Sequence, residues 1–126
     1  MTPATHPNLQ EPKRTVEAVA ARLIDLCQKN QFIQAQQELY DPLIERIEVD
    51  GSKVTGRENT LAREEKFLLS LESVRTEISN LAVIDHYFSL VMSLEVTFKT
   101  GQAKRIDEIC VYKVENGSIV FEQFFR

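Results

Sequence analysis

The sequence predicts one α+β domain, with helices in its first half and a meander of long strands in its second half. Up to residue 71, apolar residues recur at helical spacing. From Val74 onward, runs rich in β-branched and aromatic residues take over, and only short breaks separate them. Breaks of that length are typical of hairpins, so sequential strands should be antiparallel neighbours. This order predicts helices packed on one face of a curved antiparallel sheet.

Length and charge restrict the class of protein. The chain has 126 residues and a net charge of −4, with 43% hydrophobic and 27% charged residues. A chain of this size forms one domain with its own core. The acidic balance argues against a protein that reads a nucleic-acid backbone, which needs a basic face. No apolar run reaches the roughly 18–20 residues that cross a bilayer, so we expect neither a nucleic-acid nor a membrane partner.

The first 13 residues are expected to form a flexible arm ahead of a single domain at residues 14–126. The arm contains three prolines and few apolar side chains. It lacks the basic stretch and apolar run of a signal peptide, so a cytoplasmic location is expected. Cys27 and Cys110 lie among apolar neighbours, which favours two buried, reduced thiols, whereas a disulfide would require an oxidising compartment.

The first two helices follow from apolar stripes and from residues that begin or end a helix. One helix is predicted over residues 14–28, where apolar side chains step by three and one along a single stripe. A shorter helix is predicted over residues 32–39. Asn30 is a suitable N-cap for it, and Pro42 ends it because proline disfavours helical geometry at the residue before it.

A third helix is predicted after a short extended stretch at residues 43–49 and a turn at residues 50–51. Thr55 and Glu58 have the spacing of a capping box, in which each side chain bonds to the backbone of the other residue. The charged residues 63–66 are interpreted as the exposed face of this helix. Its core face is assigned to Leu61, Ala62, Leu68, Leu69 and Leu71.

The second half of the chain predicts four strands joined by tight turns. The strands are expected at residues 74–84, 87–99, 103–114 and 118–125. The second of them alternates clearly, so that one face forms the core or a cavity wall and the other is small and mixed. The apolar face carries Phe88, Leu90, Met92, Leu94, Val96 and Phe98.

Two registers are possible for the last hairpin, and they place the final strand on opposite faces. A two-residue loop at residues 116–117 would pair Glu115 with Ser118, whereas a three-residue loop would pair Val114 with Ser118. We prefer the longer loop because it makes one face mostly apolar. That register places Glu108, Cys110 and Tyr112 with Glu122, Phe124 and Arg126. It leaves Ile109, Val111, Ile119, Phe121 and Phe125 on the opposite face.

Three segments together resemble the SnoaL-like branch of the nuclear transport factor two superfamily. They are the end of the second helix at residues 39–41, the glycine-containing segment at residues 54–58, and the hairpin at residues 112–120. The resemblance spans residues 15–126. It implies a cone-shaped, cystatin-like α+β barrel that forms a homodimer through the outer face of its sheet. It also implies a pocket between the inner face and the helices, occupied by an unknown small apolar ligand.

The superfamily includes polyketide cyclases, ketosteroid isomerase, dehydratases and non-catalytic binding modules, so the fold does not fix the activity. The isomerase pattern is absent from this sequence. Its oxyanion tyrosine would fall at Leu23, its general base at Ile47 or Glu48, and its second oxyanion donor near Cys110. Leucine donates no hydrogen bond and a thiol donates only a weak one, so an enolate would not be held at these positions.

The resemblance to cyclases directs attention to acidic side chains in the pocket. Glu108 and Glu122 are the candidate catalytic residues, because burial beside aromatic rings would raise the pKa of either carboxyl toward neutrality. The alternative is that Arg126 pairs with one of them across the strands and neither touches a ligand. Ligand contacts are expected from Cys110, Tyr112, Phe124 and Arg126, and Glu95 and Asp107 are reserve acids.

Three further residues are weaker candidates. Tyr40 and Asp41 end the second helix where the family's pocket rim lies, and they are predicted to contact the ligand. The alternative is a core tyrosine followed by an aspartate that begins a turn. His86 follows a strand and is either a cavity residue or an exposed turn residue.

The sequence contains no cluster of histidine and cysteine with metal-ligand spacing and no phosphate-binding glycine loop. No metal and no cofactor are therefore predicted. The expected function is a SnoaL-like small-molecule-binding domain with acid–base chemistry, cyclase-like or isomerase-like, on an apolar ligand that carries a carbonyl group. The alternative is a non-catalytic dimeric module of the same fold that binds a ligand or a partner protein.

Overall fold

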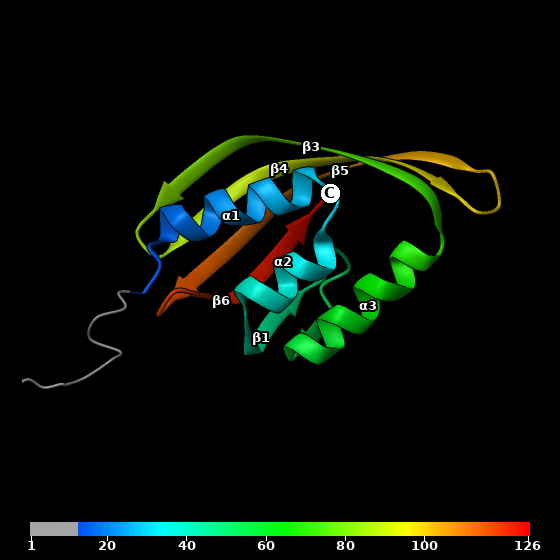
Figure 1. The fold of residues 1–126 in the computed structure, drawn as a ribbon. Coiled ribbons are helices and arrows are strands. Elements are labelled where there is room, and N and C mark those ends of the chain that lie inside the picture. The colour runs from blue at the N-terminus through cyan, green and yellow to red at the C-terminus, as the bar shows by residue number, and fades with distance from the viewer. Residues whose placement is uncertain (1–12) are drawn as a thin grey trace, which may run out of the picture.

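A computed structural model describes residues 13–126, in which helices cover one face of a mixed sheet (Figure 1). Residues 1–12, and with them most of the predicted arm, lie outside the described part. In chain order the elements are α1 (Val16–Gln28), α2 (Phe32–Leu39), β1 (Tyr40–Ile47), β2 (Lys53–Thr55), α3 (Arg57–Leu69), β3 (Leu71–Ile84), β4 (Tyr87–Phe98), β5 (Ala103–Glu115) and β6 (Ser118–Phe125).

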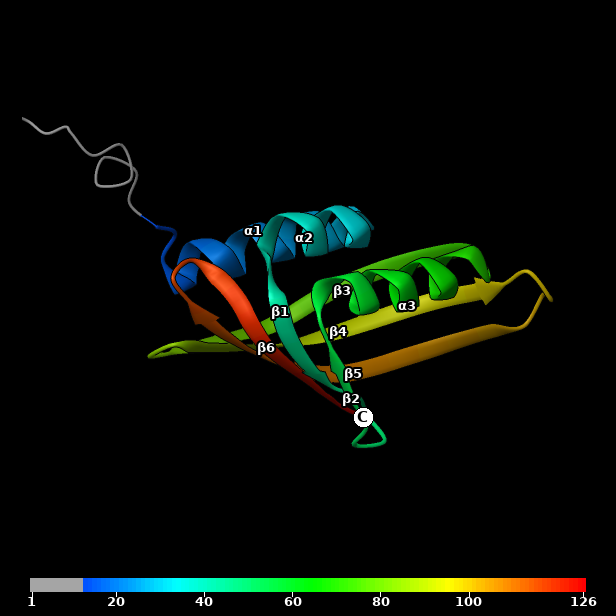
Figure 2. The ribbon, with the colours of Figure 1, turned by 90° about the horizontal axis from the view of Figure 1, so that it is seen from below.

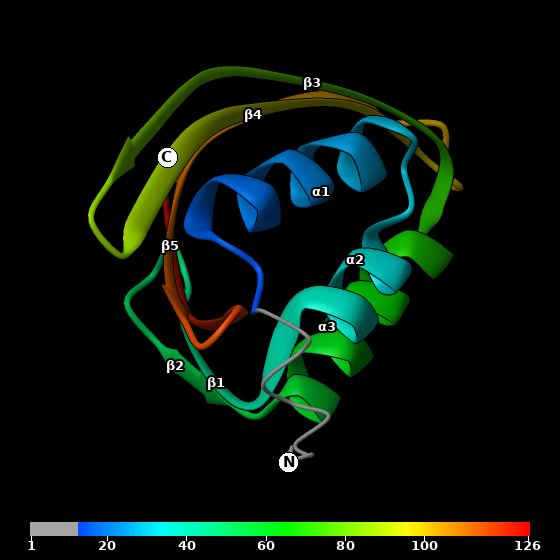
Figure 3. The ribbon, with the colours of Figure 1, turned by 60° about the vertical axis from the view of Figure 1, so that its left-hand side comes forward.

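The sheet has the strand order β2-β1-β6-β5-β4-β3, so it is open, with β2 and β3 at its edges. All neighbouring strands are antiparallel except β1 and β6, which run parallel. Figure 2 shows the three helices on one side of the sheet, and Figure 3 shows β3 and β4 curving around α1. The predicted α+β class, with three helices on a curved, mostly antiparallel sheet, is confirmed.

The core forms where the apolar stripe of α1 meets the inner face of the long strands. Leu23 and Leu26 of α1 are each 2% exposed. The apolar alternation predicted along β4 is confirmed, since Phe88, Leu90, Met92, Leu94 and Val96 are buried. Phe88 stacks on Tyr112 of the neighbouring strand at 4.7 Å between ring centroids. Both cysteines are buried and free, as predicted.

The link between α1 and α2 differs from the prediction. Gln31, not Asn30, is the N-cap of α2, and its side chain makes no capping hydrogen bond. Asn30 instead has a left-handed backbone, with φ 61°. Its side chain donates to the carbonyl oxygen of Val74 and accepts from the hydroxyl of Thr76. Hydrogen bonds to β3, which lies far along the chain, thus replace the helix cap that was predicted for Asn30.

The beginning and core face of α3 also differ from the prediction. Gly56, with φ 92°, is the N-cap, and there is no side-chain cap, so the capping box is wrong. The reason is that Thr55 belongs to β2 and pairs with Glu45 of β1. Leu71 begins β3, and Leu69 is 71% exposed. Thr60 is the fully buried residue of this helix, so its inner face is more polar than expected.

Strand β1 begins earlier than predicted and pairs in an unpredicted way. It starts at Tyr40 and contains Pro42. It runs parallel to β6, which places Tyr40 beside Ile119 and Arg46 beside Glu122, with an irregularity between Tyr40 and Glu45. A parallel neighbour cannot be inferred from hairpin spacing, because the two strands are far apart in the sequence.

The last hairpin has the shorter of the two possible loops. Glu115 pairs with Ser118, and Asn116 and Gly117 both have positive φ, which is the geometry of a type I′ turn. The preferred three-residue loop is therefore wrong. A one-residue irregularity in the pairing then shifts the register.

That shift restores the predicted face for the rest of β6. Tyr112 pairs with Glu122 and Cys110 with Phe124, so these residues do share a face. Ile119 lies before the shift and is fully buried, so its predicted place on the opposite face is wrong. The register of the candidate site therefore depends on an irregularity that turn chemistry alone does not predict.

Candidate functional site

A cavity of about 500 Å³ lies between the helices and the inner face of the sheet. Its walls come from all three helices and from β1, β4, β5 and β6. Part of the wall is apolar and consists of Leu23, Cys27, Phe32, Phe67, Met92, Leu94 and Ile106. Its polar groups include Gln36, Tyr40, Arg46, Glu48, Glu64 and Glu108. Such a cavity is suited to a mostly apolar ligand that presents oxygen atoms at one end.

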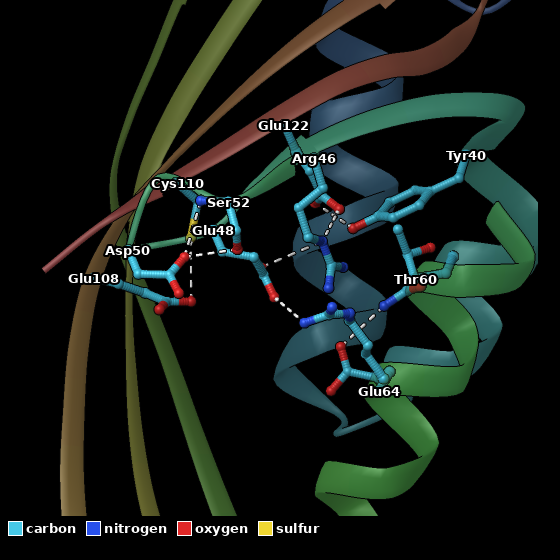
Figure 4. A network of polar contacts seen from close by, with 12 residues as sticks. Tyr40, Arg46, Glu48, Asp50, Ser52, Thr60, Glu64, Glu108, Cys110 and Glu122 are labelled. Carbon is cyan, nitrogen blue, oxygen red and sulfur yellow. Dashed lines mark hydrogen bonds and ion pairs between the residues drawn. The ribbon is translucent and has the colours of Figure 1, made fainter. Parts of the chain in front are cut away.

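A buried ion pair stands at the polar part of the cavity, where β1 and β6 run side by side (Figure 4). Arg46 donates from Nε to Oε2 of Glu122 at 2.7 Å, and Tyr40 donates its hydroxyl to Oε1 of the same carboxyl at 2.5 Å. The side chain of Glu122 is 0% exposed and that of Arg46 is 7% exposed. Both oxygens of Glu122 are therefore occupied by partners from β1.

The charges in this group stabilise one another. Burial raises the pKa of Glu122, while Arg46 and the Tyr40 hydroxyl oppose that rise. Burial lowers the pKa of Arg46, but Glu122, Tyr40 and Glu48 together outweigh that effect and the pKa lies above its usual value. Burial also raises the pKa of Tyr40, so its phenol stays neutral. Arg46 is thus a fixed cation in the cavity wall.

The guanidinium of Arg46 is held on two sides. Glu122 binds its Nε, and the ring of Phe124 lies 5.1 Å from its central carbon. In Figure 4 its head points away from Glu122, toward the space between Glu48 and Glu64. Among residues 13–126, no hydrogen-bond partner is found for its two terminal nitrogens. Those nitrogens are therefore left to face the cavity.

A second polar pair faces the cavity from the helices. Gln36 of α2 donates from Nε2 to Oε1 of Glu64 on α3 at 2.9 Å. Burial raises the pKa of Glu64 from 4.5 to about 7, with Glu122 and Glu108 adding to the rise and Arg46 opposing it. A carboxyl with such a pKa can both take up and release a proton near neutral pH.

The amide of Gln36 bonds to Glu64 with one atom and leaves its other polar atom unpaired. The hydrogen bond that it donates to Oε1 of Glu64 favours the ionised carboxyl and so opposes the rise in pKa that burial causes. Oε1 of Gln36 is buried and has no hydrogen-bond partner within residues 13–126. A buried acceptor without a donor is unfavourable by about 1–3 kcal/mol.

Arg126 pairs with Glu108, as in the alternative in which it pairs across the strands with one of the two candidate acids. Arg126 donates from Nε to Oε2 of Glu108 at 3.1 Å, and the thiol of Cys110 lies 3.8 Å from the other oxygen. The side chain of Glu108 is 11% exposed and that of Arg126 is 47% exposed. Nearby, Arg63 of α3 reaches Oε2 of Glu48 at 3.3 Å. Charged pairs thus surround the cavity.

The structure brings most of the predicted site residues together. Tyr40, Glu108, Cys110, Tyr112, Phe124 and Arg126 line the cavity. Glu122 is not part of the lining and lies behind it, bonded to Arg46. Asp41 is also outside the lining, and its carboxylate accepts from the backbone of Leu43. His86 is exposed beside Asp85, and Glu95 and Asp107 pair with Arg105 at the surface.

Sequence reasoning missed Gln36, Arg46 and Glu64, and each had a detectable signal. Gln36 stands within the apolar stripe of α2. Arg46 follows the buried Ile44 by two residues and so shares its face of β1. Glu64 lies one helical turn after the buried Thr60 and one before Leu68, although it was interpreted as part of an exposed charged run. A polar residue on a predicted core face was the common signal.

Two kinds of feature are absent from residues 13–126. No group of three or more histidine, cysteine, aspartate or glutamate side chains is placed to hold a metal ion. No helix in this range is long and apolar enough to cross a bilayer.

Comparison with known families identifies one match. A family model described as a SnoaL-like domain matches residues 14–126. None of the curated proteins that were compared matches the chain.

Solved structures share the fold at low sequence identity. One is a Mesorhizobium loti protein named as a SnoaL-like polyketide cyclase, with carbohydrate phosphatase in brackets. It is 23% identical to this chain with a TM-score of 0.78, and the match covers 90% of this chain and 100% of that protein. One from Jannaschia sp. CCS1, also named as a SnoaL-like polyketide cyclase, is 15% identical, with TM-score 0.75, over 87% and 83%. An NTF2-like protein of Burkholderia pseudomallei is 12% identical, with TM-score 0.74, over 86% and 88%. At these identities the likeness establishes the fold alone.

Proposed function

This chain belongs to the SnoaL-like domain family, and we propose that it binds an apolar, carbonyl-bearing small molecule in the cavity and moves a proton on it. Glu64 is the proposed catalytic acid and base. The observation that carries this proposal is the placement of a protonatable carboxyl inside the cavity wall, facing the same space as the fixed cation of Arg46. Fold neighbours named as polyketide cyclases support a carbonyl-rich ligand.

The proposed step is removal of a proton from the carbon beside the ligand carbonyl. The ionised form of Glu64 takes that proton, and the acid form returns it to another atom of the ligand. Negative charge that develops on the carbonyl oxygen is stabilised by the guanidinium of Arg46, which needs no rearrangement because Glu122 and Phe124 already hold it. The apolar wall excludes water from the ligand body.

The acids and ligand contacts predicted from sequence take specific places in this proposal. Glu108 is a second carboxyl at the cavity, restrained by Arg126. Glu122 and Tyr40 act through Arg46 as positioning residues, since both oxygens of Glu122 are occupied. Cys110, Tyr112 and Phe124 form part of the wall, and Asp41 is proposed to have no direct contact with the ligand.

Proton removal can be tested with 2-tetralone, a bicyclic ketone with exchangeable protons beside its carbonyl. We expect the protein to accelerate deuterium uptake from heavy water, followed by proton NMR. Glu64→Gln should slow the protein-dependent exchange by about 100-fold or more, because an amide cannot carry the proton. Glu65→Gln, a neutralisation of the next and exposed residue on α3, is the matched control and should exchange as wild type does.

Two results would contradict the proposal. The first is that 2-tetralone binds to the wild-type protein, as shown by NMR line broadening, but takes up deuterium no faster than in buffer alone. The other is equal exchange by wild type and Glu64→Gln. Either result would favour the non-catalytic alternative, a dimeric binding module, which the full pairing of Glu108 and Glu122 also favours.

We also propose a homodimer through the outer face of the sheet, in the region of residues 91–97. Val91, Ile109 and Phe125 lie side by side across β4, β5 and β6. Ile109 is 50% exposed and Phe125 is 46% exposed. A contiguous apolar patch on a sheet face is typical of a surface that a partner covers.

Light scattering at micromolar concentration should give twice the chain mass of 14.5 kDa. Ile109→Arg is expected to produce a monomer, because it places an unpaired charge in the centre of the apolar patch. Ile84→Arg, at the exposed end of β3, is the control and should remain dimeric. A monomeric wild-type protein, or an Ile109→Arg protein that stays dimeric, would contradict this interface.

A further inference from the structure

We propose that Arg46 binds an acid group of the ligand that has two coplanar oxygen atoms, either a carboxylate or the enolate of a 1,3-diketone. The proposed ligand is therefore an apolar carbonyl compound that is also an organic acid. This inference rests on the proposed function, because it assigns the ligand class of the same cavity. It is carried by the contacts of Arg46 and not by those of Glu64.

The free edge of Arg46 has the shape that such an acid group requires. Glu122 takes the Nε hydrogen bond, and the shortest approach of Glu48 to the guanidinium is also to Nε, at 4.0 Å. The edge formed by the two terminal nitrogens is thus unused within the described residues. Parallel N–H groups on that edge match two oxygens of one planar acid, and a single carbonyl oxygen would leave one of them unpaired.

Burial makes this unused edge informative. The side chain of Arg46 is 7% exposed, and its terminal nitrogens are not among the fully enclosed atoms of residues 13–126 that lack a partner. They therefore open to the cavity that Arg46 lines, where a ligand can reach them. A ligand acid that fills the cavity would pair these donors, and the ring of Phe124 and the carboxyl of Glu122 already fix the guanidinium for it.

The charges around the cavity oppose an anion least when Glu64 is protonated. The cations are Arg46, Arg63 and Arg126, and each has a carboxylate partner in Glu122, Glu48 and Glu108 respectively. These pairs sum to zero charge, and the rim also carries Asp50. An ionised Glu64 would therefore repel an incoming acid. The acid form of Glu64, which its burial favours, removes that repulsion.

The test measures binding and not turnover. The probes are 2-naphthoate, its methyl ester and the 1,3-diketone benzoylacetone, titrated into wild-type protein by calorimetry. We expect 2-naphthoate or benzoylacetone, or both, to bind about 10–100 times more tightly than the ester, as two charge-assisted hydrogen bonds imply. The probe that binds more tightly than the ester shows whether the acid group is a carboxylate or a diketone enolate.

Arg46→Lys keeps the charge beside Glu122 but lacks the planar edge, so it should lose that preference while still binding the ester. If Arg46→Lys does not fold, the double variant Arg46→Met with Glu122→Gln takes its place in the test. This double variant removes both buried charges. Arg63→Lys, which alters the arginine of α3 at the cavity rim, should keep the preference. Arg75→Lys, which alters an exposed arginine of β3, is the control.

The inference is overturned if the ester binds as tightly as both acids, or if Arg46→Lys keeps the preference. It is also overturned if Arg63→Lys loses the preference, because the acid would then bind at the rim. Loss of tetralone exchange in Glu64→Gln bears only on the proposed proton transfer. The two hypotheses can therefore fail separately.

Discussion

Replacing Arg46 with methionine is expected to lower the free energy of unfolding by about 3–5 kcal/mol, the largest effect predicted for a single side chain. The change leaves the carboxyl of Glu122, which is 0% exposed, without its cation. The Tyr40 hydroxyl, at 2.5 Å from Oε1, would be its one remaining side-chain partner in the described structure. Urea unfolding at neutral pH, followed by circular dichroism, measures the loss.

A double variant shows whether the loss comes from the unpaired charge. Adding Glu122→Gln to Arg46→Met removes the buried carboxylate and should recover most of the lost stability, because the amide can still accept from Tyr40. Arg75→Met removes an exposed arginine on β3 that pairs with Glu77 and Glu95, and should change stability by less than about 1 kcal/mol. A double variant no more stable than Arg46→Met would show that packing, and not charge, explains the loss.

Replacing Glu64 with glutamine is expected to stabilise the protein in alkaline solution and not in acid. Burial raises the pKa of Glu64 in the folded state from 4.5 to about 7. Between these values the folded protein holds a proton that the unfolded chain has released, so wild-type stability falls as the pH rises through this window. A full shift of that size corresponds to about 3 kcal/mol. Glutamine does not titrate, so the variant does not lose this stability as the pH rises.

The measurement is the difference in unfolding free energy between Glu64→Gln and wild type, at about pH 4 and about pH 8. We expect the difference to become more favourable to the variant at the higher pH. Glu65→Gln, the exposed neighbour, should show no such change between the two pH values. A difference independent of pH would mean that Glu64 titrates normally in the folded state.

Much of the fold could be predicted because its signals are local. The stripe of α1 and the alternation of β4 are properties of a few consecutive residues, and both elements lie where they were expected. Errors appeared where a distant partner competed with a local signal. The side chain of Asn30 bonds to β3 and does not cap the helix that follows it. Thr55 lies in β2 and pairs with β1.

The candidate site could be predicted only in part, because its pairs come from distant parts of the chain. Glu108 and Arg126 were placed on one face by counting along a hairpin, and they do meet. Arg46 and Glu122 are 76 residues apart in the sequence, and Gln36 and Glu64 are 28 apart. The parallel pairing of β1 with β6 joins the first pair, and the packing of α2 on α3 joins the second.

The amino-acid sequence by itself determined the α+β class, the core-facing stripe of α1 and the inward face of β4. Each of these follows from periodicity along a continuous segment. Only the tertiary structure decided that Glu122 is enclosed behind Arg46, and that Glu64 faces the cavity beside Gln36. The physical reason is that burial and charge pairing depend on which segments meet in space. The same glutamate is a solvated charge, half of a buried ion pair or a proton carrier according to its neighbours.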